Sequence, residues 1–225
     1  MSSLDFFRLL RGDYLEQLND EHWQVLPNYS ATIPITRLET TYRCHTDVAD
    51  FLRRWVYEQD GINYDSDQTY KIPPIETENI SLQNILDHDT PITLVLHEDA
   101  SSRQSNQVEA KIAKNLIENI PPSETTGVVT PHNAQKGLLN TMTDRAQVDT
   151  VERFQGGQRD VMIVSATVSD PDYLSAESEF ILNPNRLNVA LSRMKKKLVV
   201  IAPKTLFTLI PNDTDEYEDS IIWKG

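Results

Sequence analysis

Blocks of apolar and polar positions alternate regularly through the second half of the chain. Runs of nearly uninterrupted apolar residues, which predict strands buried on both faces, lie at 92–96, 126–130, 147–151, 159–167 and 197–203. Between them, apolar residues three or four positions apart predict helices at 107–120, 133–142, 185–195 and 204–210. Helices that alternate with buried strands predict an α/β domain with a parallel sheet covered on both faces. In such a sheet, ligands gather at the carboxyl ends of the strands.

The first 90 residues have a different pattern. Apolar residues at helical spacing predict helices at 2–18 and 46–60. Residues 60–90 are polar and include two adjacent prolines, a composition typical of irregular chain. The sequence therefore predicts a helical segment and an irregular excursion ahead of the α/β domain.

Composition narrows the class of protein. A chain of 225 residues with 39% hydrophobic content can bury the core of one domain. Its single cysteine, Cys44, excludes an internal disulfide, and the sequence has no apolar run of the roughly 18 residues that a membrane span needs. These features predict a soluble cytoplasmic protein with no membrane partner.

The charge of the chain restricts how it could bind nucleic acid. Its net charge is −13, so a nucleic-acid partner would have to meet a local basic patch. A candidate patch is the basic run formed by Arg186, Arg193, Lys195, Lys196 and Lys197. Acidic residues crowd the stretch 212–225, which we interpret as a solvated tail.

The stretch VERFQGGQRD at 151–160 places two adjacent glycines before a predicted strand, in a chain that has only seven glycines. Glycine permits positive φ and lets backbone N–H groups approach a ligand closely. A tight turn alone would explain the pair. However, seven polar or charged side chains surround it, more than a turn needs: Thr150, Glu152, Arg153, Gln155, Gln158, Arg159 and Asp160.

Two arginines stand next to predicted helices. Arg43 lies in TTYRCH just before one helix, and Arg193 lies in RLNVALSRMKKK near the end of another. Arg193 could equally be a surface charge that complements the helix dipole. Cys44 and His45 have no second pair of ligands at zinc spacing, so no metal site is predicted.

A further candidate is the stretch GVVTPHNAQ, where a predicted strand ends and a helix begins. It presents Thr130, His132, Asn133 and Gln135 at the helix start. Backbone N–H groups at such a start favour an anion, so this stretch is a candidate phosphate contact.

Taken in the order TYRCH, GVVTPHNAQ, VDTVERFQGGQRDVMIVSAT and RLNVALSRMKKKLVVI, these stretches resemble the C-terminal half of superfamily 1 helicases. The resemblance is to the branch that includes the nonsense-mediated-decay helicase and its DNA-acting relatives. It covers residues 38–203, and its last two motifs are close to the fifth and sixth helicase motifs. It implies a second RecA-like domain, which closes over ATP bound to a first RecA-like domain and grips single-stranded nucleic acid across both.

The resemblance also implies a role for each matching residue. Arg43 would be the arginine of the fourth motif that reaches the γ-phosphate, and Arg193 the arginine finger of the sixth. Gly157 and Gln158 would lie near the ribose of the nucleotide. The residues implied in contacts to the phosphates of the strand are Thr130, Asn133, Gln135 and Thr150. Arginine suits phosphate through its permanent forked charge, and hydroxyls bind phosphate oxygens without reading sequence.

The chain departs from the family in two respects. The family usually has Glu where this chain has Gln158, and a neutral amide is a weaker acceptor for a ribose hydroxyl. The 225 residues contain no G-x-x-x-x-G-K-[ST] loop and no apolar strand ending in Asp-Glu. We therefore expect the chain alone to be catalytically inert, and ATP and Mg²⁺ to bind only together with a first RecA-like domain. Met1 is interpreted as a truncation point, a split gene or the start of an isolated domain.

We predict the C-terminal motor domain of an ATP-dependent DNA or RNA helicase, which supplies arginine fingers and single-strand contacts to a P-loop domain in cis or in trans. The expected organisation is a helical segment at 1–60 leading into the fourth motif, an irregular excursion at 61–90, a RecA-like domain at 91–211 and an acidic tail at 212–225. The alternative is a catalytically inert nucleic-acid-binding or partner-docking module, a helicase remnant. A P-loop half encoded upstream would favour the motor.

Overall fold

The computed structural model describes residues 40–58, 61–154, 157–178, 188 and 191–208. The chain divides into two units, Met1–Leu38 and Glu39–Gly225, and every described residue belongs to the second. The helix expected at 2–18 and the acidic tail therefore lie outside the described residues.

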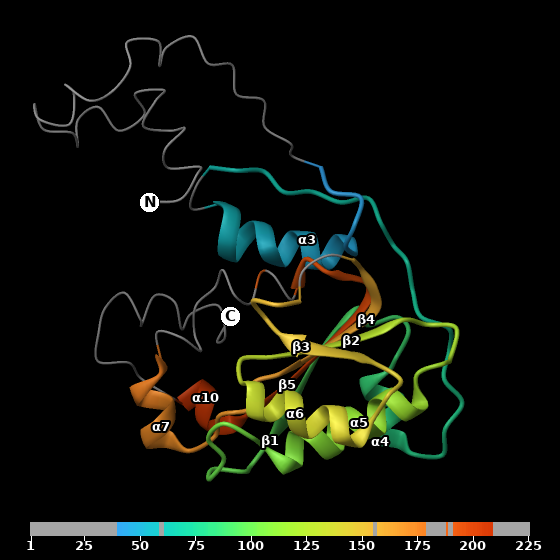
Figure 1. Ribbon diagram of the computed structural model, residues 1–225. Coiled ribbons are helices and arrows are strands. Elements are labelled where there is room, and N and C mark those ends of the chain that lie inside the picture. Colours follow the sequence, from blue (N-terminus) through green and yellow to red (C-terminus); the bar gives the residue numbers. More distant parts are fainter. Residues whose placement is uncertain (1–39, 59–60, 155–156, 179–187, 189–190, 209–225) are drawn as a thin grey trace, which may run out of the picture. The chain divides into compact units, whose positions relative to one another are not determined.

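Five parallel strands form one sheet in the order β1-β5-β4-β2-β3 (Figure 1). Their bounds are β1 Ile92–His97, β2 Thr126–Thr130, β3 Gln147–Thr150, β4 Arg159–Ser165 and β5 Met194–Pro203. Each lies where an apolar run predicts a strand, and the predicted α/β class with a parallel sheet is confirmed. Because all strands run the same way, the sheet has one amino edge, where strands begin, and one carboxyl edge, where they end.

Helices connect and cover the strands. They are α3 Thr46–Leu52, the π-helix η3 Arg53–Tyr57, α4 Ile80–Ile85, α5 Gln107–Asn119, α6 Asn133–Met142, α7 Pro171–Ala176 and α10 Lys204–Thr208. Two of them have no counterpart among the predicted helices: α4 lies in the stretch 60–90 expected to be irregular, and α7 lies in the polar stretch after the strand predicted at 159–167. Both have six residues, too few to show a helical period, and each begins at a side-chain cap, Asn79 for α4 and Asp170 for α7.

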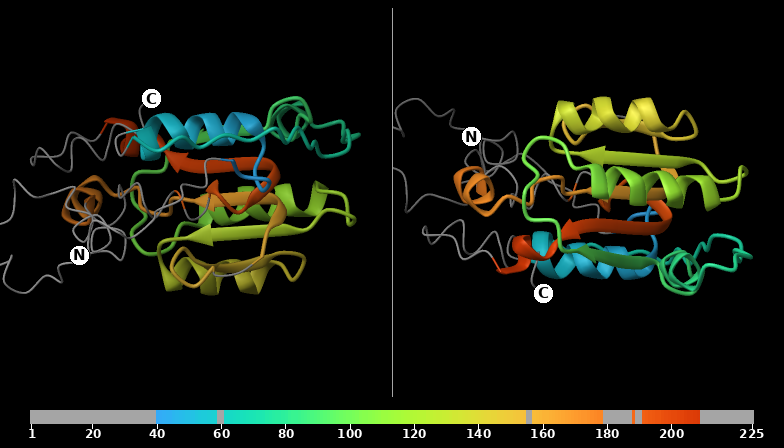
Figure 2. Two further views of the ribbon diagram at one scale, coloured as in Figure 1. Left: turned by 90° about the horizontal axis from the view of Figure 1, so that it is seen from above. Right: turned by 90° about the horizontal axis from the view of Figure 1, so that it is seen from below.

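The two faces of the sheet carry different helices (Figures 1 and 2). On one face, α4, α5 and α6 pack their apolar side chains against strand residues such as Val161 and Ile163. On the other face, α3 packs against the alternate strand residues, including Met162 and Val164. The alternation follows from the two-residue period of a strand and accounts for the uninterrupted apolar runs in the sequence.

The predicted helix at 46–60 changes its winding midway. It begins as α3 and continues as the π-helix η3, a form that is rare and frequent at functional sites. The change brings the hydroxyl of Tyr57 within 3.0 Å of the Asn188 side-chain nitrogen, and the Tyr57 ring stacks on Tyr64. The helix after the fourth motif is thereby bonded to the segment that precedes β5. None of the described helices is long and apolar enough to cross a membrane.

Candidate nucleotide and nucleic-acid interfaces

The residues implied in nucleotide contacts lie at the amino edge of the sheet. Gly157 and Gln158 directly precede β4, and Arg193 directly precedes β5. The two segments are bonded to each other, because the backbone N–H of Arg159 donates to the carbonyl of Arg193 at 3.0 Å. The fifth and sixth motifs therefore meet at neighbouring strand starts.

Arg193 has an unusual environment for a charged side chain. The residue is half-buried, and its Nε is buried with no hydrogen-bond partner among the residues that the structure describes. A buried donor without a partner costs roughly 1–3 kcal/mol, so such groups are rare and often mark a site completed by something else. The guanidinium of Arg193 is therefore a candidate ligand-binding group.

Arg43 lies on a segment fixed to the neighbouring chain. Its own side chain is exposed, but the backbone around it bonds to residues 65–68: Ser66 Oγ donates to the Cys44 carbonyl at 2.7 Å, and Thr46 N–H donates to the Gln68 carbonyl at 2.8 Å. Cys44 is fully buried in the same core cluster as Met194. The figures show this segment beside the amino ends of β4 and β5 (Figures 1 and 2). The residues that follow Arg43 and Arg193 thus belong to one core.

The glycine turn before β4 has a structural basis of its own. Gly157 has a φ of +90°, and a Cβ there would lie 3.1 Å from Nη1 of Arg159. Upstream, the Phe154 ring is fully buried over Gly127, where a Cβ would come within 2.7 Å of that ring. The Arg159 guanidinium lies 5.9 Å from the Phe154 ring centroid. The turn is therefore anchored by an aromatic residue against a glycine in the neighbouring strand.

Sequence reasoning did not single out Phe154 or Gly127. A glycine inside a predicted strand is a signal for close backbone approach, and TGVVT contains one. The aromatic residue that fills the space could not be identified from that signal alone.

The residues implied in strand contacts lie at the opposite, carboxyl edge. Thr130 ends β2 and Thr150 ends β3, and the two are register partners in the sheet. Both are buried, and Oγ1 of Thr130 lies 2.7 Å from Oγ1 of Thr167. The structure thus brings the predicted threonines together but encloses them within the domain.

Gln135 and Asn133 stand on the first turn of α6 and differ in exposure. Gln135 is fully buried, where it accepts from the Asn106 N–H at 2.8 Å and donates to Oγ of Ser165 at 3.0 Å. Asn133 is exposed and lines a pocket of about 570 Å³ at this edge. Of the four predicted strand contacts, Asn133 alone presents its side chain to solvent.

His132 lies in the wall of the same pocket. Burial lowers its pKa, although the nearby carboxylates of Glu177 and Glu152 act in the opposite direction. Its Nε2 is 3.8 Å from the Glu177 carboxylate, and its ring is tilted against Tyr173 with centroids 6.3 Å apart. The pocket wall therefore combines an imidazole whose pKa is lowered by burial with one acidic side chain.

A buried charged group beneath the carboxyl edge was not predicted. Glu109 on α5 is fully buried and lies 3.0 Å from Nε2 of His97, the last residue of β1. Its other oxygen accepts from Ser165 Oγ at 2.5 Å and from the Thr167 N–H at 2.9 Å. No short motif marks Glu109; a carboxylate beside the apolar face of a predicted helix is its only signal in the sequence.

Two members of the predicted basic run, Lys196 and Lys197, have partners within the protein and do not form an open phosphate-binding patch. Lys197 is buried within β5, with Nζ donating to the Asp87 carbonyl at 3.0 Å and to Thr93 Oγ1 at 2.9 Å. Lys196 is paired with Glu124 at 2.7 Å. Both lie in the first half of β5, far along the strand from its carboxyl end. These two lysines are therefore turned to the core or to an acidic partner, whereas Arg193 has the environment described above and Arg186 lies outside the described residues.

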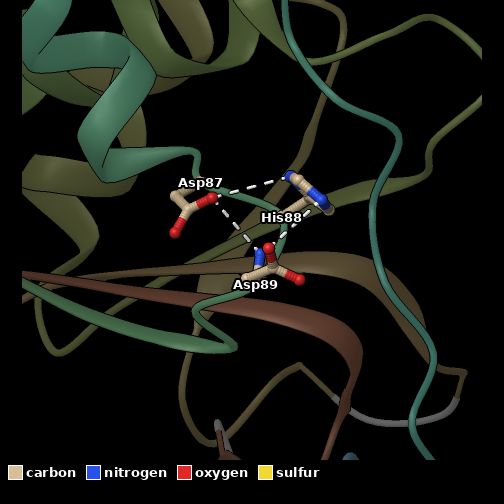
Figure 3. A group of neighbouring side chains, drawn as sticks. All are labelled: Asp87, His88 and Asp89. Atoms are coloured by element: carbon tan, nitrogen blue, oxygen red, sulfur yellow. Dashed lines mark hydrogen bonds and ion pairs between the residues drawn. The ribbon is translucent and has the colours of Figure 1, made fainter.

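One cluster among the described residues could bring metal-binding atoms together: Asp87, His88 and Asp89, in the turn before β1 (Figure 3). Its carboxylates already have partners within the protein. Asp87 accepts from Thr90 Oγ1 at 2.9 Å and from the Asp89 N–H, and Asp89 bonds Lys71 at 2.5 Å. We therefore interpret the cluster as a bonded turn.

Comparison with known proteins identifies the protein family of this chain. Residues 15–205 match the family described as AAA domain. The chain belongs to this family, and its resemblance to the second-domain region of superfamily 1 helicases is confirmed.

Curated relatives are helicases. The chain is 31% identical over 113 residues to the DNA replication ATP-dependent helicase/nuclease JHS1 of Arabidopsis thaliana, a match covering 48% of this chain and 8% of that protein. It is 36% identical over 107 residues to the DNA polymerase alpha-associated DNA helicase A of Saccharomyces cerevisiae, covering 43% and 15%. It is 26% identical over 189 residues to the Regulator of nonsense transcripts 1 homolog of Neurospora crassa, covering 76% and 17%. The chain spans less than a fifth of the length of these relatives.

A solved structure with a similar arrangement is the C-terminal domain of a possible DNA helicase from Lactobacillus plantarum. It shares 13% sequence identity with this chain at a TM-score of 0.43, and the match covers 72% of this chain and 88% of that one.

Proposed function

We propose that this chain is the second motor domain of an ATP-dependent helicase, and that its amino edge completes a nucleotide site with a P-loop RecA-like domain. Family membership supports the motor, and the buried Nε of Arg193, which has no partner in the described part of the chain, is the observation that carries the assignment of the edge. In nucleotide-hydrolysing proteins such as the GTPases, an arginine that stabilises transition-state charge is worth about 10³ to 10⁵ in rate. Arg193 has the position and the free donor for that role.

The residues of the amino edge fit a phosphate-bearing nucleotide. Arg193 and Arg43 would bind the negative charge of its phosphates, and Gln158 beside the turn at Gly157 would bond the ribose. When bound, ATP supplies the phosphoanhydride bond whose hydrolysis drives the motor. This chain would orient the phosphates and stabilise charge, while Mg²⁺ would be held by carboxylates of the P-loop domain.

The carboxyl edge is the proposed contact for single-stranded nucleic acid. Asn133 is exposed at the start of α6 and can donate to a phosphate without reading sequence. Thr130 and Gln135 are enclosed behind it, so we assign them to holding the backbone of this turn in place. Thr150, the register partner of Thr130, would support the same surface from β3.

Phosphate release tests this assignment. It would be measured for the chain alone and for the chain joined to a P-loop RecA-like domain from one of its helicase relatives, each with and without single-stranded DNA. The chain alone should show no turnover, and the joined protein should show strand-stimulated turnover that Arg193→Ala abolishes. Turnover of about 1 per second by the chain alone, a normal enzymatic rate, would contradict the proposal.

A further inference from the structure

Thr167 has a backbone conformation that β-branched residues rarely adopt. Its φ is 71°, and it is the one non-glycine residue with positive φ in the described part of the chain. The Val168 N–H donates to the Ala166 carbonyl at 2.8 Å, so residues 166–168 form a γ-turn of the rarer, strained kind. The turn directly follows β4 at the carboxyl edge. Strain of this kind persists where the surrounding structure imposes it, and it clusters at functional sites.

Several buried groups impose this conformation. Glu109 accepts from the Thr167 N–H at 2.9 Å, and the Asn106 side chain donates to the Thr167 carbonyl at 3.2 Å. Both residues are fully buried, and Glu109 is itself held by Ser165 and His97. The turn is thus fixed on both sides of its peptide backbone by side chains from the start of α5.

The Thr167 turn also helps to hold the proposed strand-binding edge in place. The Thr167 hydroxyl lies 2.7 Å from the Thr130 hydroxyl, and Thr130 Oγ1 accepts from the His132 N–H at 3.5 Å. His132 directly precedes α6, whose first residue is the exposed Asn133. A series of hydrogen bonds therefore runs from the strained turn to His132, the residue directly before the one assigned to the strand.

We propose that Thr167 is a positioning residue for strand binding: the hydroxyl that its strained turn presents to Thr130 fixes the start of α6 and so the placement of Asn133. This inference rests on the proposed strand contact at the carboxyl edge. It explains why a β-branched residue occupies a position where glycine would be free of strain. It also gives the enclosed Thr130 a role that requires no direct contact with nucleic acid.

The test uses the whole chain and a fluorescein-labelled oligothymidylate, with affinity measured by fluorescence anisotropy at low salt. Thr167→Gly accommodates the positive φ but removes the hydroxyl with its bonds to Thr130 and Ser165. It should fold normally and bind the strand roughly three- to tenfold more weakly, the range expected when the bond to Thr130 is lost. Thr167→Ser keeps the hydroxyl and should bind like the unsubstituted chain. Circular dichroism and urea unfolding would establish that all variants are folded under the assay conditions.

The same bond can be tested from its other end. Thr130→Val removes the hydroxyl and keeps the shape, whereas Thr130→Ser keeps the hydroxyl, so the first should weaken binding and the second should not. This pair decides the question even if Thr167→Gly fails to fold.

The outcomes separate the inference from the proposed function. If Asn133→Ala weakens binding while Thr167→Gly and Thr130→Val bind normally, the positioning role is overturned and the strand contact stands. If the unsubstituted chain does not bind, or Asn133→Ala binds unchanged, the proposed strand contact fails and the inference fails with it.

Discussion

At the carboxyl edge, Glu109, Thr167 and Gln135 all have hydrogen-bond partners within the domain, whereas at the amino edge the buried Nε of Arg193 has none among the described residues. An unsatisfied buried donor lowers stability, so its persistence suits a group that bonds to something outside the domain. A satisfied network instead fixes a surface before any ligand arrives. The comparison indicates that the amino edge is completed by a partner, whereas the carboxyl edge is already fixed before a ligand binds.

The largest expected effect is a loss of ATP hydrolysis when an arginine of the amino edge is replaced. In a two-domain protein that joins this chain to a P-loop RecA-like domain, Arg193→Lys should lower kcat by about 10³, because an ammonium keeps the charge but loses the forked geometry. Steady-state ATP hydrolysis with saturating single-stranded DNA measures it.

Arg145→Lys is the matched control for that substitution. Arg145 donates to the carbonyls of Glu118 and Ile120 and is not one of the predicted nucleotide contacts, so its replacement should leave kcat near the unsubstituted value. Equal losses in the two variants would show that Arg193 acts through stability alone.

The next largest expected effect is a loss of stability when the buried hydrogen-bond network at the carboxyl edge is disrupted. Glu109→Ala should lower the free energy of unfolding by roughly 3–5 kcal/mol, because it leaves His97, Ser165 and the Thr167 N–H without their buried acceptor. Urea denaturation measures the change. Glu118→Ala, an exposed glutamate on the same helix paired with Lys114 at 3.7 Å, should cost less than about 1 kcal/mol. Similar costs at both positions would remove the argument for a prepared network.

A third effect concerns Lys197, whose pKa burial lowers from 10.5 to about 8. Between these values the unfolded chain keeps a proton that the folded chain has lost, so stability should rise with pH, by at most about 3 kcal/mol. Urea unfolding of the unsubstituted chain and of Lys197→Met, compared from pH 8 to pH 10.5, isolates this contribution. If the free energy of unfolding changes with pH in the same way in both proteins, the oxygens around Nζ keep the Lys197 ammonium charged in the folded state.

The smallest expected effect is weaker binding of single-stranded DNA when Asn133, the exposed residue at the carboxyl edge, is replaced. Asn133→Ala should weaken binding of single-stranded DNA by roughly three- to tenfold and leave its salt dependence unchanged, because the lost group is neutral. Anisotropy titrations at several salt concentrations measure both. Asn140→Ala, at an exposed position later on the same helix, should bind normally. A change in salt dependence with Asn133→Ala would point to a displaced cation instead.

The sheet could be predicted from sequence because its strands are buried on both faces and therefore appear as apolar runs. The prediction was less accurate at β5, which begins at Met194, three residues ahead of the predicted start at 197. The predicted helix at 185–195 was carried over Met194 and Lys195, which belong to β5, because the charges of Lys195 and Lys196 interrupt the apolar run that marks the strand. The prediction also carried β4 on to 167, whereas the strand ends at Ser165 and the chain enters the Thr167 turn. A positive φ at threonine is imposed by Glu109 and Asn106, which lie about 60 positions earlier.

The order of the motifs in the sequence was enough to predict part of the candidate site. Arg43, Gly157 and Arg193 match motifs in sequence, and the structure sets their segments at one edge of the sheet. The burial of Thr130 and Gln135 was not predictable, because it depends on Thr167, Asn106 and Ser165, none of which belongs to the motif that contains them. Motifs locate a site, but the partners of each side chain are set by tertiary packing.

Amide chemical shifts of the chain titrated with oligothymidylate would show whether the two edges have separate ligands. If they do, shifts are expected at Asn133, Ala134 and the Thr167 turn, with the amides of Arg43, Gly157 and Arg193 unchanged. Shifts of equal size at the amino edge, or confined to it, would contradict the assignment of the carboxyl edge to the strand.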